Sequence, residues 1–230
     1  METAQQFITP TSVPVVPRID VFAASIPART YTGDFYSYSR TDDNGLLLIV
    51  GDVAGKGIHA AVYMAMIQEE LERLNERGTS PCAVIREMNA ILFEHMPRNR
   101  FATMVTARIG PTGETQIVNA GHLPVLIRRA SGAVDVIKAN GSALGMFDTG
   151  CWKGETTRLE RGDVLIAYSD GLVEASSKSN EEFGLDRLIS AVAALSPHSP
   201  RDVASSLLAT AHAFAGSWTD DVTISAVQMV

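Results

Sequence analysis

Four aspartates occupy the same kind of position along this chain, and they are its best candidates for chemistry. Asp34, Asp52, Asp170 and Asp220 each stand at the edge of a β-rich run, beside a glycine or a second aspartate. One aspartate in such a place is often only a turn residue. Four in one context favour a shared site, and gathered carboxylates repel one another unless cations lie between them. We therefore expect an all-oxygen metal site.

The donor set indicates which ions this site would prefer. No group of histidines and cysteines with zinc-ligand spacing accompanies the aspartates, and no twelve-residue loop of alternating oxygen ligands indicates an EF-hand. Carboxylate oxygens suit Mg²⁺ or Mn²⁺. Two such ions held close together can lower the pKa of a shared water and orient it for in-line attack on phosphorus.

The segment around Asp52 shows how the fold would present one of these carboxylates. Residues 46–50 are five consecutive apolar residues, which predicts a strand buried on both faces. A charge where such a strand surfaces is costly unless it is paired or bound to a metal. Gly55 and Gly57 then allow a tight turn before a helix that begins at Ile58.

Hydrophobic periodicity predicts the remaining elements. Apolar residues at helical spacing predict helices from Ile58 to near Gly78 and from Ser80-Pro81 to about Met96, and two more at 185–195 and 200–215. Strands are expected at 19–25, 33–40, 102–109, 115–120, 124–129, 133–138, 155–159, 164–168 and 222–230. The turns after 109, 120 and 129 are interpreted as three successive hairpins. This order predicts an α+β fold, with two stacked antiparallel β-sheets flanked by pairs of helices.

Composition limits the protein class. The 230 residues, 46% of them hydrophobic, suit one domain at 19–230, preceded by an extended, proline-containing lead-in at 1–18. A net charge of −7 argues against a nucleic-acid partner. Cys82 and Cys151 form no disulfide framework, and no apolar run approaches the roughly 18 residues of a membrane span. We expect a cytoplasmic protein without a membrane partner.

Two other readings of the motifs are weaker. The stretch GDVAGKG superficially resembles a P-loop, but it has three residues rather than four between Gly51 and Gly55-Lys56, and Gly57 replaces the required Ser or Thr. Lys56 could attract phosphate, although a solvated turn lysine is more typical. His122, placed in a predicted hairpin turn, is interpreted as an ordinary exposed polar residue, with a direct catalytic role as the weaker alternative.

Five motifs, taken in order, resemble those of the metal-dependent PPM serine/threonine phosphatases, and more closely those of their bacterial SpoIIE/RsbU branch. They are GDFY at 33–36, GDVAGKG at 51–57, NAGH at 119–122, YSDG at 168–171 and DDVT at 220–223. The resemblance extends from about Ile19 to the C-terminus. It implies a β-sandwich flanked by helix pairs, with two Mn²⁺ or Mg²⁺ ions in a cleft at one edge.

The resemblance also implies the ligands. Asp52 would bridge the two ions, and Asp34 would serve the second ion partly through water. Asp221 would be an outer or alternative ligand. The implied metal ligands are Asp34, Asp52, the Val53 carbonyl, Asp170, Asp220 and Asp221, and the catalytic residues among them are Asp34, Asp52, Asp170 and Asp220.

The function that this resemblance implies is hydrolysis of phosphoserine or phosphothreonine on a partner protein by metal-activated water. The implied substrate is a phosphorylated STAS-type anti-anti-sigma factor, and a regulatory protein partner and homodimerisation stay open. One departure supports an alternative. The branch commonly reads GDFYD, but Ser37 replaces the final acid here. A catalytically silent binding module, or a hydrolase of small phosphoesters, would be the other readings.

Overall fold

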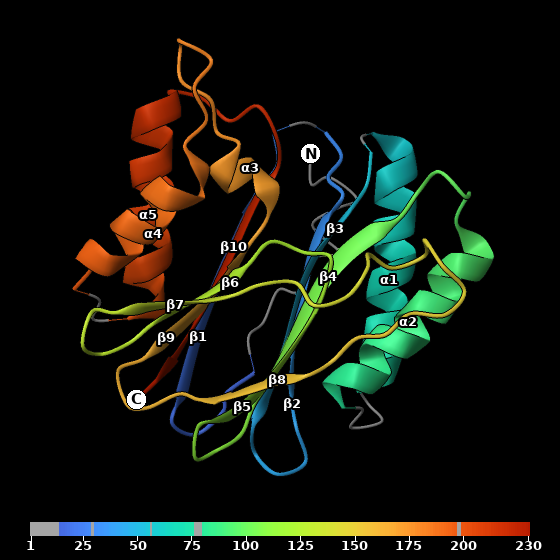
Figure 1. Ribbon diagram of the computed structural model, residues 1–230, viewed down its shortest axis with the longest axis horizontal. Helices are drawn as coiled ribbons and strands as arrows, with labels where there is room; N and C mark the ends of the chain where they lie inside the picture. The colour runs from blue at the N-terminus through green and yellow to red at the C-terminus, as the bar shows by residue number, and fades with distance from the viewer. Residues whose placement is uncertain (1–13, 29, 56, 76–79, 197–198) are drawn as a thin grey trace.

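The chain folds into four layers, with helices outside and two β-sheets inside (Figure 1). The structure is a computed structural model that describes residues 14–28, 30–55, 57–75, 80–196 and 199–230. Every pairing between the strands of these sheets is antiparallel. The predicted α+β fold of two stacked antiparallel sheets flanked by helices is confirmed.

The two sheets have five strands each. Sheet I has the order β1 (Ile19–Ile26), β10 (Val222–Met229), β9 (Val164–Tyr168), β6 (Val125–Arg128) and β7 (Val134–Ile137). Sheet II has the order β2 (Asp34–Arg40), β3 (Leu46–Val53), β4 (Ala102–Ile109), β5 (Glu114–Ala120) and β8 (Glu155–Arg158). The chain therefore crosses between the sheets several times, which brings distant sequence segments together at the ends of the sandwich.

Strand β3 is buried on both faces, as the sequence predicted. Leu46, Leu48 and Val50 belong to the apolar core between the two sheets. Leu47 and Ile49, on the opposite face, pack in the core beneath the helices that cover sheet II. A strand held from both sides is a rigid support for the carboxylate that follows it.

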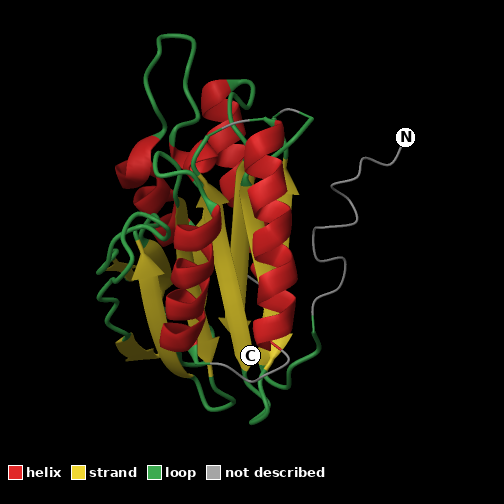
Figure 2. Ribbon diagram, turned by 90° about the vertical axis from the view of Figure 1, so that its right-hand side faces the viewer, coloured by secondary structure: helices red, strands yellow, loops and turns green. Residues whose placement is uncertain are grey.

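Helices cover the outer face of each sheet. Along sheet II lie α1 (Ile58–Asn75) and α2 (Pro81–His95), which Figure 2 shows from their own side. On sheet I lie α4 (Gly184–Ala194), α5 (Pro200–Ala215) and α3 (Asp170–Val173), a short helix that the periodicity did not predict. None of the described helices is long and apolar enough to cross a membrane. Lys56, residues 1–13 of the lead-in and the predicted helix end near Gly78 lie outside the described residues.

The prediction of three successive hairpins was wrong at its centre. Strand β5 pairs with β4 and β8 in sheet II, whereas β6 pairs with β7 and β9 in sheet I. Residues 121–124 therefore cross between the sheets. The Asn119 side chain stabilises this crossover, because its Oδ1 accepts from the His122 amide (2.8 Å) and its Nδ2 donates to the Leu123 carbonyl (2.9 Å). A glycine turn looks the same in sequence whichever sheet receives the next strand.

Candidate metal centre

All five predicted aspartates line one pocket of about 450 Å³ at one end of the sandwich. Asp34 and Asp52 come from β2 and β3 of sheet II. Asp170 follows β9, and the pair Asp220-Asp221 precedes β10, both in sheet I. The pocket thus lies where the two sheets meet, and each sheet contributes carboxylates.

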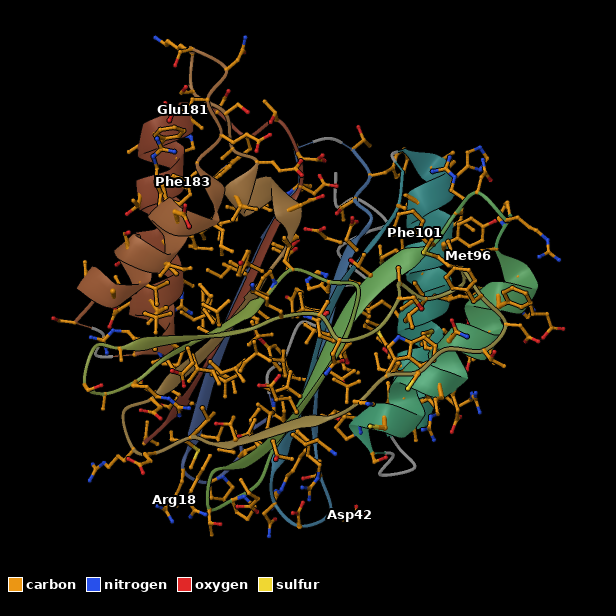
Figure 3. All side chains as sticks on the ribbon, viewed as in Figure 1. Arg18, Asp42, Met96, Phe101, Glu181 and Phe183 are labelled. Carbon is orange, nitrogen blue, oxygen red and sulfur yellow. The ribbon has the colours of Figure 1, made fainter. Side chains whose placement is uncertain are left out.

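Figure 3 helps to locate this end of the molecule. Phe101, which lines the pocket, lies at the upper end of β4. Arg18 and Asp42 lie at the opposite end of the sandwich. The turn between β2 and β3 is therefore remote from the carboxylates.

Asp34 is held in place by residues of the opposite sheet. It is paired in register with Asp52 on the adjacent strand, and its side chain is buried. Its Oδ2 accepts a hydrogen bond from the Ser169 hydroxyl at 2.6 Å, and Ser169 Oγ itself accepts from the Thr223 amide at 2.8 Å. Because Ser169 follows β9 and Thr223 belongs to β10, this chain of bonds ties sheet II to sheet I at the pocket.

Burial and neighbouring negative charge raise the pKa of two of the carboxylates, Asp34 and Asp52. Burial, followed by the charges of Asp34, Asp170, Asp220 and Asp221, raises the pKa of Asp52 to about 9. Burial also raises the pKa of Asp34 to about 7, and its hydrogen bond with Ser169 opposes part of that rise. A cation placed among these groups would offset both the cost of burying their charges and the repulsion between them.

The oxygen donors fit a hard divalent cation by type, and two of them face the same space. A Cβ added to Gly33 would lie 2.8 Å from Asp52 Oδ1 and 2.9 Å from the Val53 carbonyl oxygen, so these two oxygens approach the same small space. Only a glycine leaves that space open. Among the described residues, no three Asp, Glu, His or Cys side chains already stand close enough to hold a metal ion. The donors share the pocket without converging on one point.

His122 is not the exposed turn residue that the sequence indicated. Its ring is buried in the crossover from β5 to β6 and lines the pocket. Nε2 lies 3.0 Å from the Tyr168 carbonyl oxygen, which can only accept, so Nε2 carries the proton. Nδ1 then accepts from the Thr103 hydroxyl at 2.8 Å. Burial lowers the pKa of His122 to about 4, so the ring is neutral at neutral pH.

Sequence reasoning missed two residues that shape the pocket. Glu174 lines the pocket one helical turn after Asp170. If α3 had been predicted, this spacing would have placed Glu174 on the same side of the helix as Asp170. The Arg100 guanidinium lies against Gly55 and donates to the Ala54 carbonyl at 2.8 Å, while the Ala54 amide donates to the Phe101 carbonyl at 2.9 Å. The entry to β4 thereby fixes the turn that follows Asp52.

Ser37, the departure from the common motif, does not contribute to the pocket. It is buried in β2 three residues after Asp34, and alternation along the strand places it on the same face as Phe35. Phe35 packs in the core beneath α1 and α2. An acidic residue at position 37 would point toward that helical layer.

Curated relatives are similar in sequence to most of this chain. The phosphoserine phosphatase RsbU of Bacillus subtilis is 30% identical over 189 residues, which cover 80% of this chain and 56% of the relative. The protein IcfG of Synechocystis is 28% identical over 218 residues, covering 83% and 34% respectively. The chain thus spans about a third to about half of the length of these relatives.

Solved structures share the fold. The RsbU and RsbW domains of a Mycobacterium tuberculosis protein match 96% of this chain and 62% of theirs, with a TM-score of 0.80 and 28% identity. The PP2C phosphatase domain of Bacillus subtilis SpoIIE matches 93% of this chain and 64% of its own, with a TM-score of 0.81 and 22% identity. The sequence model of Stage II sporulation protein E (SpoIIE) matches residues 42–230. The resemblance indicated by the motifs is confirmed, and the chain belongs to the SpoIIE family of PPM-type phosphatases.

Proposed function

We propose that this protein is a metal-dependent protein serine/threonine phosphatase. The observation that carries the proposal is the pocket in which aspartates from both sheets meet. Burial, together with the charges of the other aspartates, raises the pKa of Asp52 to about 9, and cations would offset both effects. The names of two relatives, the phosphoserine phosphatases RsbU and RsbP of Bacillus subtilis, support the same activity.

Two Mn²⁺ or Mg²⁺ ions would be held by oxygen atoms alone. The proposed ligands are Asp34, Asp52, the Val53 carbonyl, Asp170, Asp220 and Asp221, all of them in or beside the pocket. When bound, the ions would supply Lewis-acid activation of a water and neutralise the charge of the phosphate. A structural relative, RsbX, was solved in complex with magnesium, and at 18% identity it supports the fold only.

The protein's own residues prepare the site. Six carboxyl groups line the pocket, so a phosphate dianion would be repelled without the ions, and the metal is needed for substrate binding as well as for chemistry. The Ser169 hydroxyl and the Arg100 guanidinium hold Asp34 and the turn after Asp52 in place. Tyr31, Phe101, Leu123 and Pro124 add a partly apolar lining that suits the surface of a protein substrate.

The proposed substrate is a phosphorylated STAS-type anti-anti-sigma factor, dephosphorylated at serine or threonine in the cytoplasm. This proposal rests on the motif resemblance to the RsbU branch and on the relationship to RsbU itself. We also propose residues 19–230 as the phosphatase unit, because β1 begins at Ile19 and pairs with β10 along its whole length.

Release of phosphate from a phosphorylated STAS protein tests the proposal. We expect turnover with Mn²⁺ or Mg²⁺, none with EDTA, and a loss of at least a hundredfold in Asp52→Asn and Asp170→Asn. Asp148→Asn is the matched control, because Asp148 is exposed and lies outside the pocket lining. Comparison with a small aryl phosphate would distinguish a phosphoprotein substrate from a small phosphoester.

Absence of turnover with either metal, combined with intact binding of the STAS protein, would contradict the proposed phosphatase activity. It would favour the catalytically silent binding module. The one sequence feature behind that alternative was Ser37. Because Ser37 faces away from Asp34 and does not line the pocket, it gives the alternative little support.

A further inference from the structure

We propose that His122 is a positioning residue, a neutral strut between the two sheets that sets the separation of the aspartates on either side of the metal pocket. The inference rests on the proposed function, because it concerns how that site binds its ions. It assigns His122 no contact with substrate and no proton transfer.

The contacts of His122 fix it at three points. Its ring nitrogens bond to the Thr103 hydroxyl of β4 and to the Tyr168 carbonyl of β9, which belong to different sheets. Its backbone amide donates to Asn119 Oδ1 at 2.8 Å. The imidazole ring is rigid and planar, so it holds its two partners at a constant distance. A flexible side chain would lose rotamer entropy to do the same.

Each end of the strut lies next to a proposed ligand. Thr103 is paired in register with Asp52 on the neighbouring strand. Tyr168 is the last residue of β9, two positions before Asp170. The hydrogen bonds of His122 therefore connect the strand beside Asp52 to the strand end that carries Asp170. Within sheet II, strand pairing already sets the spacing of Asp34 and Asp52, but no strand pairing in the described structure sets a spacing between the sheets.

A second bond between the sheets supports this reading. The Ser169 hydroxyl donates to Asp34, so Tyr168 and Ser169 attach the end of β9 to sheet II at two successive residues. Ser169 acts through a proposed ligand, whereas His122 acts through Thr103 and Tyr168, which are not ligands. His122 can therefore be altered without removing a bond from any aspartate.

Two amide substitutions separate the two ends of the strut. In His122→Asn the amide can occupy the Nδ1 position and keep the Thr103 contact, but it cannot reach the Tyr168 carbonyl. In His122→Gln the terminal amide can reach the Nε2 position and donate to Tyr168. Titration calorimetry of the full chain with Mn²⁺ alone measures the effect. Because each variant keeps only one end of the strut, we expect both His122→Asn and His122→Gln to weaken Mn²⁺ binding by about 10- to 100-fold.

Thr106→Val is the control for a general loss of stability. Thr106 is buried in the same strand β4, and its hydroxyl donates to the Pro81 carbonyl at 3.5 Å, away from the pocket. We expect thermal unfolding in EDTA to confirm that all three variants fold, and Mn²⁺ binding to be unchanged in Thr106→Val. Excess Mn²⁺ should recover the turnover of His122→Asn, because the substitution affects ion binding and not the chemical step.

The outcomes are distinct. Wild-type Mn²⁺ affinity in His122→Asn would overturn the proposed positioning role of His122. An equal loss of Mn²⁺ affinity in His122→Asn and Thr106→Val would do the same. Wild-type Mn²⁺ affinity in His122→Gln would also overturn it, because the contact with Thr103 would then be irrelevant. Absence of Mn²⁺ binding by the wild type would overturn both this inference and the proposed metal centre. Mn²⁺ binding that follows the expected order, without phosphatase turnover, would contradict the proposed function alone.

Discussion

Replacing Asp52 with asparagine should inactivate the protein and at the same time stabilise its metal-free fold. Asp52 is largely buried, and four other aspartates raise its pKa together with that burial. In the absence of cations the native state therefore gains nothing from this charge. An asparagine side chain would keep the shape of the aspartate and remove its charge, along with its proposed role as a metal ligand.

The size of the effect follows from the pKa. An unfolded aspartate has the ordinary pKa of 3.8, whereas Asp52 in the native fold has a pKa of about 9. Because the native state binds more protons, stability from this group is present below pH 3.8 and is lost as the pH rises toward 9. At about 1.4 kcal/mol per pH unit, the loss at pH 7 has a ceiling of about 4 kcal/mol. Relaxation and counterions reduce this to about 1–3 kcal/mol.

Thermal unfolding in EDTA between pH 5 and pH 9 measures the prediction. For a chain of this size, a gain of about 1–3 kcal/mol corresponds to a rise in Tm of roughly 3–10 °C. Asp52→Asn should show this rise at pH 7 and a flatter dependence on pH than the wild type. Added Mn²⁺ should stabilise the wild type through mass action and leave Asp52→Asn unchanged.

Asp148→Asn again provides the control, since that exposed side chain lies outside the pocket. Its Tm and its response to Mn²⁺ should match the wild type. A lower Tm for metal-free Asp52→Asn, or an unchanged pH dependence, would refute the view that the aspartates repel one another strongly in the native pocket. Equal stabilisation of both proteins by Mn²⁺ would refute the role of Asp52 as a ligand.

Three other substitutions test neighbouring features. Gly33→Ala places a Cβ within 3 Å of Asp52 Oδ1 and the Val53 carbonyl, so Mn²⁺ affinity by calorimetry should fall at least tenfold; an unchanged affinity would show that these oxygens are not ligands. Tyr168→Phe removes a buried hydroxyl that has no hydrogen-bond partner in the described structure, so urea unfolding should show equal stability or a gain of about 1 kcal/mol. The lowered pKa of His122, about 4 against an ordinary 6.5, makes stability fall as the pH drops below 6.5. Between pH 7 and pH 5 this contributes up to about 2 kcal/mol, which should be absent from the pH dependence of His122→Gln.

Local signals were sufficient for most elements of the fold. The apolar run at 46–50 predicted a strand buried on both faces, and β3 is one, because its two faces meet different cores. The helix predicted at 200–215 matches α5, Pro200–Ala215. Proline at its start and glycine after its end act on the backbone within a few residues, so sequence alone reports them.

Contacts between distant segments could not be predicted in the same way. The turn before β6 has the glycine and polar residues of a hairpin, and only the partners of β6 in sheet I make it a crossover. His122 looked like a surface residue for that reason. Its burial depends on Thr103 and Tyr168, which lie 19 and 46 residues away in the chain. Helix α3 is too short for a periodic pattern to reveal it.

The aspartates were predictable for a physical reason that also explains what was missed. A charged residue at the end of a buried strand costs free energy unless it is paired or bound to a metal, so an aspartate at such a position is conspicuous in sequence. The side chains that hold the aspartates in place are ordinary in sequence, because a serine, a threonine or a neutral histidine acquires its role only through its partner. In this pocket those partners belong to the opposite sheet, as with Ser169 and Asp34. Metal affinity should accordingly depend on packing between the sheets as much as on the aspartates themselves.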